Sequence, residues 1–332
     1  MAGHWLERHW WRPTALSTLL APIGWIYCAL AVLRRTAYRR GWRRSLRIGV
    51  PVIVVGNLTV GGTGKTPLVS WLVRTLAADG WRPGIVSRGY GGHARTWPRD
   101  VHADTDPALV GDEPVLLAVQ TGRPVVVAPD RVAAARRLLE TSDCDIVVAD
   151  DGLQHLRLAR DIEIAVVDDR RGGNGRCLPA GPLREPVGRL ATVDAVVCNG
   201  SAQAGEISMT IRPVGFRHLV DSGRHAPLDA FRGKRLHAAA GIGNPGRFFA
   251  LLRRLECDVV EHAYPDHHAY NKSDIVFGDA LPVVMTEKDA VKCRSLADER
   301  HWYMAIEAVP GADLASLIRT RLRERSHGPQ TA

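Results

Sequence analysis

The chain contains 332 residues, 45% of them hydrophobic, and carries a formal net charge of +9. This length is typical of two domains or of one large domain with an appendage, and the composition excludes a wholly disordered chain. The positive charge indicates anionic partners, either phosphates, membranes or nucleic acid. The six cysteines have no metal-ligand spacing, and most lie in or beside apolar runs. They therefore indicate buried free thiols in a reducing cytosolic compartment, without a disulfide framework.

The first predicted element is an apolar helix near the N-terminus. Residues 14–33, TALSTLLAPIGWIYCALAVL, include no charged side chain, and a helix of this length would be about 30 Å long, or one hydrocarbon thickness. Pro22 interrupts the run, and the large apolar side chains recur at helical spacing. Seven arginines follow between Arg34 and Arg47. The tryptophans around the run suit a headgroup interface, and they are Trp5, Trp10, Trp11 and Trp25.

An apolar helix beside a polybasic run combines two signals for membrane association. We therefore expect residues 1–47 to contact an anionic membrane surface. The sequence leaves three arrangements open: a helix that lies on the membrane or inserts shallowly, a true span, and a helix buried in the protein core. A cleaved signal peptide is disfavoured, because the basic cluster follows the apolar run instead of preceding it.

After Arg47, apolar runs rich in β-branched residues alternate with helical patterns. Strands are predicted at residues 50–55, 85–86, 125–128, 146–149, 162–167 and 195–198, and helices at residues 68–78 and 131–140. Short buried strands that alternate with helices predict an α/β fold with a mostly parallel sheet covered on both faces. We assign this core to residues 48–205.

The alternation lapses near Gly200. Residues 208–219, SMTIRPVGFRHL, are interpreted as an irregular or antiparallel segment within a connector that spans residues 206–220. A smaller C-terminal α/β domain is expected over residues 221–332, with strands at 236–240, 258–263, 283–286 and 302–307 and helices at 246–255 and 312–323. The tail after Ser326 is expected to be frayed.

A glycine-rich loop, NLTVGGTGKTP at residues 57–67, lies between the first core strand and an amphipathic helix. It nearly matches the phosphate-binding pattern G-x-x-x-x-G-K-[ST], except that Thr59 occupies the first glycine position. The glycines allow backbone N–H groups to surround phosphate oxygens, while Lys65 can reach the β- and γ-phosphates and Thr66 can bind Mg²⁺. A turn without a ligand is the alternative, but it would not require Lys-Thr at this position. The predicted nucleotide-binding residues are Thr59, Val60, Gly61, Gly62, Thr63, Gly64, Lys65 and Thr66.

An acidic pair follows a later core strand. In CDIVVADDGLQH, residues 144–155, the apolar part ends at Asp150 and Asp151. Carboxylates at the C-terminal end of a strand lie where α/β sheets bind ligands, and they can hold the metal that accompanies a nucleotide. Either aspartate could bind Mg²⁺, and a polar exit from the strand is the alternative interpretation.

Eight motifs occur in order along the chain. They are VGNLTVGGTGKTP (residues 55–67), SRGYGG (87–92), VGDEP (110–114), DDGLQH (150–155), LPAGPLREP (178–186), GIGNPGRF (241–248), YPDHHAY (264–270) and MTEKDAVK (285–292). Together they resemble the tetraacyldisaccharide 4'-kinase family of lipid A biosynthesis, and the resemblance extends to the N-terminal helix and its basic flank. It therefore covers nearly the whole chain.

The resemblance implies a P-loop core with a smaller C-terminal α/β domain. It also implies transfer of the γ-phosphate of ATP to the 4'-hydroxyl of a tetraacylated glucosamine disaccharide 1-phosphate. The product would be the 1,4'-bisphosphate, lipid IVA, formed at the cytoplasmic face of the inner membrane, and no nucleic acid partner is expected. In this family a threonine replaces the first loop glycine, which accounts for Thr59.

The resemblance also implies roles for individual residues. A sugar hydroxyl is a weak nucleophile, so a carboxylate is expected to accept its proton or orient it. The aspartate of the GDEP motif takes this role in the family and corresponds to Asp112, for which a loop carboxylate or a helix N-cap is the alternative. The histidine of the DH motif assists and corresponds to His267, although the adjacent His268 remains possible. Lys65 completes the predicted catalytic residues, and further site candidates are Arg88, Gln154, His155, Arg184 and Lys288.

Two other interpretations belong to different classes of protein. GIGNPG at residues 241–246 matches G-x-G-x-x-G between an apolar strand and a helix, and Glu261 lies 20 residues after Gly241, as in a nicotinamide-dinucleotide site. This interpretation is disfavoured because the glycine-rich loop and the acidic pair already provide a complete site for Mg²⁺ and a nucleotide. The other alternative is a P-loop ATPase that binds nucleic acid through its basic N-terminus, but the adjoining uncharged run favours a membrane.

Overall fold

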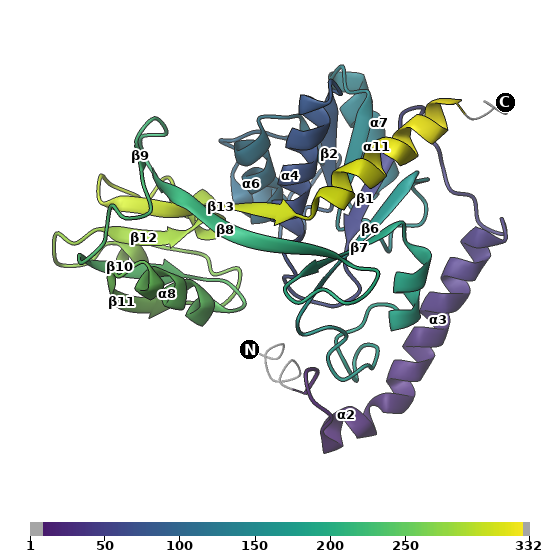
Figure 1. Cartoon of the computed structure of the whole chain (residues 1–332), viewed down its shortest axis with the longest axis horizontal. Coiled ribbons are helices and arrows are strands. Elements are labelled where there is room, and N and C mark those ends of the chain that lie inside the picture. Colours follow the sequence, from purple (N-terminus) through teal and green to yellow (C-terminus); the bar gives the residue numbers. More distant parts are fainter. Residues whose placement is uncertain (1–8, 328–332) are drawn as a thin grey trace.

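The computed structural model describes residues 9–327. Trp5 lies outside the described residues, as do residues 328–332, which belong to the tail that we expect to be frayed. The described part of the chain has a mixed α/β fold with a large, mostly parallel sheet (Figure 1). The strands are β1 (Val52–Gly56), β2 (Pro83–Ser87), β3 (Arg99–Val101), β4 (Val125–Val127), β5 (Ile146–Asp150), β6 (Ile162–Asp168), β7 (Ala195–Asn199), β8 (Ile207–His218), β9 (His225–Ala226), β10 (Arg235–Ala240), β11 (Asp258–Ala263), β12 (Val283–Thr286) and β13 (His301–Pro310). The helices are α2 (Ala15–Leu19), α3 (Ala21–Arg39), α4 (Lys65–Ala78), α5 (Pro107–Val110), α6 (Asp112–Thr121), α7 (Arg131–Thr141), the 3-10 helix η1 (Val187–Thr192), α8 (Pro245–Arg254), α9 (Lys272–Ile275), α10 (Glu287–Cys293) and α11 (Ala312–His327).

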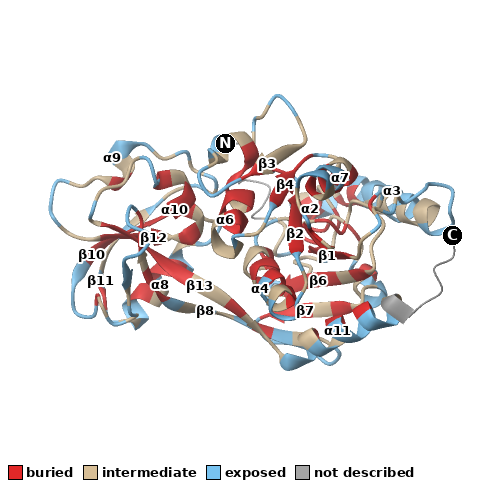
Figure 2. Cartoon of the chain, turned by 90° about the horizontal axis from the view of Figure 1, so that it is seen from above, coloured by how far each residue is buried: buried red, intermediate tan, exposed pale blue. Residues whose placement is uncertain are grey.

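The N-terminal part of the sheet is built around β1. This strand pairs in parallel with β5 on one side and with β6 on the other, and the order continues from β5 through β2 and β4 to the antiparallel edge strand β3. All of β1 is buried, because α4, α6 and α11 pack on one face of the sheet and α7 packs on the other (Figure 2). A mostly parallel sheet covered on both faces is therefore confirmed for this part of the chain.

Two long strands connect these elements to the C-terminal strands. β8 pairs in parallel with β7 at its start and antiparallel with β13 along its length. Beyond β13 the order is β12, β10 and β11, all parallel, so one 13-stranded sheet runs through the described chain. Figure 1 shows β8 and β13 as a ribbon between the two groups of elements. Residues 208–218 are thus strand, antiparallel to β13 and parallel to β7 only at their start, so the antiparallel interpretation is confirmed and the irregular one is wrong.

Two short helices that the sequence pattern did not predict, α6 and α10, pack against each other. Gly111 precedes α6 with a φ of +89°, and a Cβ atom there would lie 2.4 Å from the carbonyl oxygen of Tyr90. Only glycine tolerates both this conformation and this approach. The turn at Gly111 therefore fixes Asp112 as the first residue of α6.

The N-terminal helix is divided at Leu20 into α2 and α3. The small residues of α3 face the protein: Ala21 and Gly24 are buried, and a Cβ atom at Gly24 would lie 2.9 Å from the carbonyl oxygen of Cys177. Within residues 9–327, no helix combines the length and the apolar character needed to cross a membrane. α3 is not a core helix either, because its outer face exposes the large apolar side chains of Ile23, Ile26, Leu30 and Leu33.

Candidate active site

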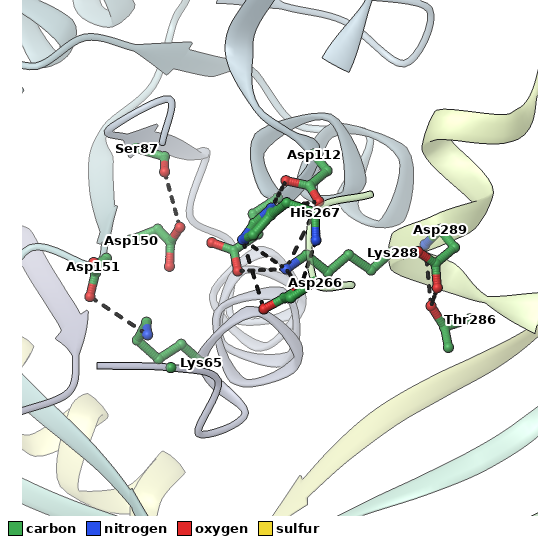
Figure 3. Close-up of polar contacts among 12 residues, drawn as sticks. Lys65, Ser87, Asp112, Asp150, Asp151, Asp266, His267, Thr286, Lys288 and Asp289 are labelled. Atoms are coloured by element: carbon green, nitrogen blue, oxygen red, sulfur yellow. Dashed lines mark hydrogen bonds and ion pairs between the residues drawn. The ribbon is translucent and has the colours of Figure 1, made fainter. Parts of the chain in front are cut away.

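The glycine-rich loop leaves the C-terminal end of β1 and leads into α4, whose first residue is Lys65. Lys65 is buried, and its Nζ atom donates a hydrogen bond to Oδ1 of Asn57 at 3.1 Å. The same Nζ atom lies 3.7 Å from Oδ1 of Asp151 (Figure 3). Gly64 has a φ of +95°, and a Cβ atom there would lie 2.8 Å from Nδ2 of Asn199. The loop is therefore a tight turn that ends at the N-terminus of α4, where Lys65 is the first helical residue. A glycine-rich turn with a lysine at a helix N-terminus is suited to binding phosphate groups.

Thr59, at the position where the usual pattern has glycine, packs against a second segment of the chain. It forms an isolated antiparallel bridge with Leu183, and the backbone N–H of Val60 donates to the carbonyl oxygen of Pro182 at 2.9 Å. The motif LPAGPLREP therefore supports the glycine-rich loop from the side. Of the other predicted loop residues, Thr63 is buried, Thr66 is half-buried, and Gly61 and Gly62 are exposed.

Asp150 and Asp151 lie beside this loop because β5 is the neighbour of β1. Asp150 is 1% exposed, and its Oδ2 accepts a hydrogen bond from Oγ of Ser87 at 3.0 Å. Burial raises the pKa of Asp150 to about 7, and the nearby carboxylates of Glu113 and Asp151 add to this effect. Asp151 instead contacts Nη1 of Arg184 at 2.8 Å, and although burial opposes the shift, Lys65 and Arg184 lower its pKa.

The two aspartates fit a metal ion that is bound together with a nucleotide. Oδ1 of Asp150 is buried and has no hydrogen-bond partner among the described residues, so it leaves one carboxylate oxygen for a cation. Residues 9–327 contain no group of three or more His, Cys, Asp or Glu side chains that could hold a metal ion. Mg²⁺ suits such an incomplete site, because it usually takes one or two carboxylates and completes its shell with waters and phosphate oxygens.

Asp112 and His267 meet across the two parts of the chain. Nδ1 of His267 lies 3.2 Å from both carboxylate oxygens of Asp112, which is 5% exposed (Figure 3). Burial raises the pKa of Asp112, but the hydrogen bond with His267 and the charge of Lys288 outweigh it and hold the pKa below its ordinary value. The same hydrogen bond raises the pKa of His267, against the effect of partial burial. The contact therefore keeps Asp112 ionised and fixes the orientation of the imidazole.

Lys288 of α10 contacts the Asp112–His267 pair and two further carboxylates, those of Glu113 and Asp266. Its Nζ atom is 3.2 Å from Oδ1 of Asp266, 3.4 Å from Nε2 of His267 and 3.9 Å from Oδ2 of Asp112. A further contact at 3.9 Å joins it to Oε1 of Glu113. Burial lowers the pKa of Lys288, but Asp112, Glu113 and Asp266 outweigh it and raise the pKa, so the ammonium group stays charged.

The two adjacent histidines have different surroundings. Nε2 of His268 lies 3.1 Å from Oδ2 of Asp274, and its ring stacks on Tyr264 with 4.7 Å between the ring centroids. The structure thus brings His267, and not His268, to Asp112.

Of the further candidates, the structure places Lys288 and Arg184 in the site and Gln154 at its border. Gln154 donates from Nε2 to the carbonyl oxygen of Asn57 at 3.2 Å and to Oε1 of Glu185 at 3.0 Å. Arg88, which follows β2, is exposed and forms no hydrogen bond or ion pair within the described part of the chain.

His155 contacts the N-terminus of α7. Its Nε2 atom accepts a hydrogen bond from the backbone N–H of Arg131 at 3.3 Å. Burial and the charge of Arg131 lower the pKa of His155 to about 4. The imidazole is therefore neutral at pH 7, and its contacts are those of a residue that caps α7.

Sequence reasoning missed several polar residues of the site. Asn57 holds Lys65, Ser87 holds Asp150, and Asn199 of β7 donates from Nδ2 to the carbonyl oxygen of Thr63 at 3.2 Å. Asn57 directly follows β1, Ser87 is the last residue of β2, and Asn199 is the last residue of β7. In the sheet these strands lie in the order β7, β6, β1, β5 and β2, so their C-terminal ends share one edge. That shared position was the available signal, because parallel strands bring their C-terminal ends to one edge.

The motif GIGNPG has a structural role in the C-terminal part. The backbone N–H of Gly241 donates to Oδ2 of Asp289 at 3.0 Å, and this carboxylate also accepts from Oγ1 of Thr286 at 2.6 Å. Glu261, the acidic residue expected to bind a ribose, is paired with Arg253. The turn at Gly241 is therefore hydrogen-bonded to α10, the helix that carries Lys288. Glu261 already pairs with an arginine, which disfavours a role in binding a ribose.

Comparison with known proteins agrees with this geometry. A family model described as tetraacyldisaccharide-1-P 4'-kinase matches residues 16–323. The chain is 55% identical over 318 residues to a tetraacyldisaccharide 4'-kinase of Alkalilimnicola ehrlichii, covering 93% of each chain, and 50% identical over 323 residues to that of Nitrosococcus oceani, covering 96% of this chain and 95% of the relative. A crystal structure of LpxK from Aquifex aeolicus in complex with ATP superimposes with a TM-score of 0.79 at 29% identity, covering 92% of this chain and 99% of that one. The chain belongs to the tetraacyldisaccharide-1-P 4'-kinase family.

Proposed function

We propose that this protein transfers the γ-phosphate of ATP to the 4'-hydroxyl of a tetraacyldisaccharide 1-phosphate and so forms the 1,4'-bisphosphate of lipid A biosynthesis. The family supports this reaction, and the similar solved structure is a complex with ATP. One observation in this chain carries the proposal: Glu113, which follows Asp112 and contacts Lys288, raises the pKa of Asp150, so the acid–histidine pair of Asp112 and His267 lies near the acidic pair beside the glycine-rich loop. Figure 3 shows the two groups of contacts in one view.

The P-loop, residues 59–66, holds the phosphates of ATP in this proposal. Its backbone N–H groups surround phosphate oxygens at the start of α4, and Lys65 places its ammonium group against the β- and γ-phosphates. Asn57 and Asp151 hold that ammonium group before ATP binds. Mg²⁺, bound by Thr66 together with Asp150 or Asp151, would supply further positive charge for the same phosphates.

Asp112 acts on the acceptor. Its ionised carboxylate accepts the proton of the 4'-hydroxyl, or orients that proton, as the oxygen attacks the γ-phosphorus. His267 donates its Nδ1–H to Asp112, and its Nε2 atom faces the ammonium group of Lys288, so in the neutral imidazole the proton is on Nδ1. Lys288 therefore acts as a positioning residue that fixes this tautomer and keeps the carboxylate ionised.

The acceptor site combines two parts of the chain. Asp112 belongs to the proposed core, residues 48–205, whereas His267 and Lys288 belong to the proposed C-terminal domain, residues 221–332, and residues 206–220 connect the two. Closure of the two parts over the disaccharide would exclude water from the γ-phosphate and so limit hydrolysis of ATP.

The exposed apolar face of α3 supports association with the cytoplasmic face of the inner membrane. Ile26 is 63% exposed and Leu30 is 60% exposed, and the basic run begins on the same helix. An amphipathic helix with these features lies in the interfacial plane, held by apolar burial and by attraction to anionic lipids. This placement would give the active site access to its acylated substrate.

Release of ADP in mixed micelles tests the proposal. ADP formation should be slow with ATP and Mg²⁺ alone, and should rise strongly when the tetraacyldisaccharide 1-phosphate is added. Equal rates with and without the disaccharide would indicate an ATPase and would contradict the proposed acceptor.

A further inference from the structure

We propose that the cavity between α3 and the N-terminal core binds the phosphate group of an anionic phospholipid; this inference rests on the proposed membrane association. The cavity has a volume of about 400 Å³, within the range of small-ligand sites. Arg35, Tyr38 and Arg39 line it from α3, and Arg160 and Arg189 line it from the core. None of the residues assigned to the ATP or acceptor sites line it, so it is a separate site.

The carboxylates that line the cavity already have partners. Glu163 accepts hydrogen bonds from Arg160 at 2.9 Å and from Arg189 at 2.6 Å. Asp161 and Asp194 each accept a backbone N–H and pair with arginines outside the cavity, which are Arg47, Arg325 and Arg321. These acidic groups therefore leave the positive charge of α3 largely uncompensated.

Two arginines and a phenol of α3 remain available to a ligand. The nearest carboxylate to Arg35 is Glu185 at 3.9 Å, which Arg189 also approaches at 3.7 Å. Burial lowers the pKa of Arg35, and repulsion from Arg189 and Arg39 adds to this effect. The guanidinium group of Arg39 and the hydroxyl of Tyr38 form no hydrogen bond or ion pair with residues 9–327. A phosphate group would accept hydrogen bonds from these donors and relieve the repulsion.

The position of the cavity on α3 favours a lipid as the source of the phosphate. Arg35 and Tyr38 are half-buried on the side of α3 that faces the protein, whereas Leu30 and Leu33 are exposed on the side expected to enter the membrane. An interfacial helix buries its apolar face by about 5–10 Å and is about 10–12 Å across, so its opposite face lies near the level of the headgroups. A lipid beside α3 can therefore reach the cavity with its phosphate while its acyl chains stay in the bilayer.

Flotation of the full chain with vesicles tests the site. The vesicles contain phosphatidylcholine alone or with phosphatidylglycerol, and the variants are Tyr38→Phe, Arg39→Gln and the control Arg34→Gln. Arg34 lies on the same helix, is exposed and does not line the cavity, so its replacement removes the same charge. General attraction to an anionic surface is worth about 1 kcal/mol, or about fivefold in affinity, for each arginine.

The site predicts that Arg39→Gln weakens binding to phosphatidylglycerol several-fold more than Arg34→Gln does. It also predicts that Tyr38→Phe, which leaves the charge unchanged, weakens binding by about twofold to tenfold, the value of one hydrogen bond. Unchanged melting temperatures of the three variants would confirm that each still folds.

Three results would overturn the site in distinguishable ways. Equal losses for the two arginine variants, with none for Tyr38→Phe, would leave only diffuse attraction and would not affect the proposed membrane association. Failure of the unaltered protein to bind either vesicle would overturn that association as well. Binding of glycerol 3-phosphate with the same order of variants, but no binding to vesicles, would assign the cavity to a soluble phosphate.

Discussion

Nδ1 of His267 lies 3.2 Å from each carboxylate oxygen of Asp112, although 155 residues separate the two along the chain. Asp112 is the first residue of α6, and His267 lies in the loop between β11 and α9. The pair therefore exists only when the two parts of the chain are packed together, and it links the acceptor chemistry to that packing.

Replacement of Asp112 by Ala should lower kcat by about 10²- to 10⁴-fold and leave the affinity for ATP nearly unchanged, because the proposed role of this carboxylate concerns the sugar hydroxyl. Initial rates beside equilibrium binding of a nucleotide would test this. Loss of ATP affinity as the main defect would instead assign Asp112 to the metal site.

The Asp112→Ala and His267→Ala variants should also be combined. If the two residues act as one unit, the double variant should be little worse than the more impaired single variant. Losses that multiply would show independent roles. His268→Ala is the matched control, because this adjacent histidine contacts Asp274 and should have a much smaller effect on kcat.

The pH dependence of kcat should report the environment of Asp112. The hydrogen bond with His267 and the charge of Lys288 lower the pKa of Asp112 against burial, so either His267→Ala or Lys288→Met should raise this pKa and move the acidic limb of the profile to higher pH. Lys272→Met, on α9, should leave the acidic limb in place. An acidic limb that does not move in the first two variants would contradict the proposed base.

The same pair should contribute to stability within a defined pH range. The lowered pKa of Asp112 stabilises the folded state above its unfolded value of 3.8, and this contribution is lost as the pH falls through the folded value. The raised pKa of His267 stabilises the folded state below its unfolded value of 6.5, and this contribution is lost as the pH rises through the folded value. The difference in unfolding free energy between the unaltered protein and His267→Ala should therefore be largest between pH 3.8 and 6.5, as denaturant titrations at several pH values would show.

Replacement of Lys65 by Ala should lower phosphotransfer by about 10²-fold or more, because it removes a positioned charge from the transferring phosphoryl group. Asp150→Asn or Asp151→Asn should instead weaken binding of ATP with Mg²⁺ or change its dependence on the metal concentration. Titration of rates against ATP and Mg²⁺ would separate these effects. Activity of Lys65→Ala within a few-fold of the unaltered protein would remove the P-loop from the mechanism.

Replacement of Ile26 and Leu30 by Ser should weaken flotation with vesicles by about tenfold or more, since each side chain loses apolar area that would be buried in the bilayer. Thermal unfolding in solution should change little, because both side chains are exposed. Val220→Ser, at an exposed apolar position outside α3, is the matched control and should float normally. Normal flotation of the Ile26 and Leu30 variant would show that another surface contacts the membrane.

The parts of the site that are contiguous in sequence could be predicted from the residues alone. The glycine-rich loop and Lys65 follow one buried strand directly, and Asp150 ends another, so their meeting at one edge follows from a parallel sheet. The division into a core and a C-terminal domain stays a prediction, since one continuous sheet runs through both.

The acceptor side could not be derived in this way, and the roles of Asp112 and His267 came from the family resemblance. α10 has 7 residues, too few to show a helical period, and the choice of His267 over His268 depends on the conformation of a loop. The contact of Lys288 with Asp112 depends on how α6 and α10 pack, which the spacing of residues along the chain does not specify.

The central claim is most directly tested by identifying the phosphorylated position of the product. The purified protein, ATP, Mg²⁺ and tetraacyldisaccharide 1-phosphate would be incubated in mixed micelles, and the lipid would be examined by ³¹P NMR and mass spectrometry. The account predicts a second phosphomonoester on the 4'-oxygen, formed by the unaltered protein and strongly reduced with Asp112→Ala. A lipid that gains no phosphate while ATP is hydrolysed, or that gains it at another hydroxyl, would contradict the account.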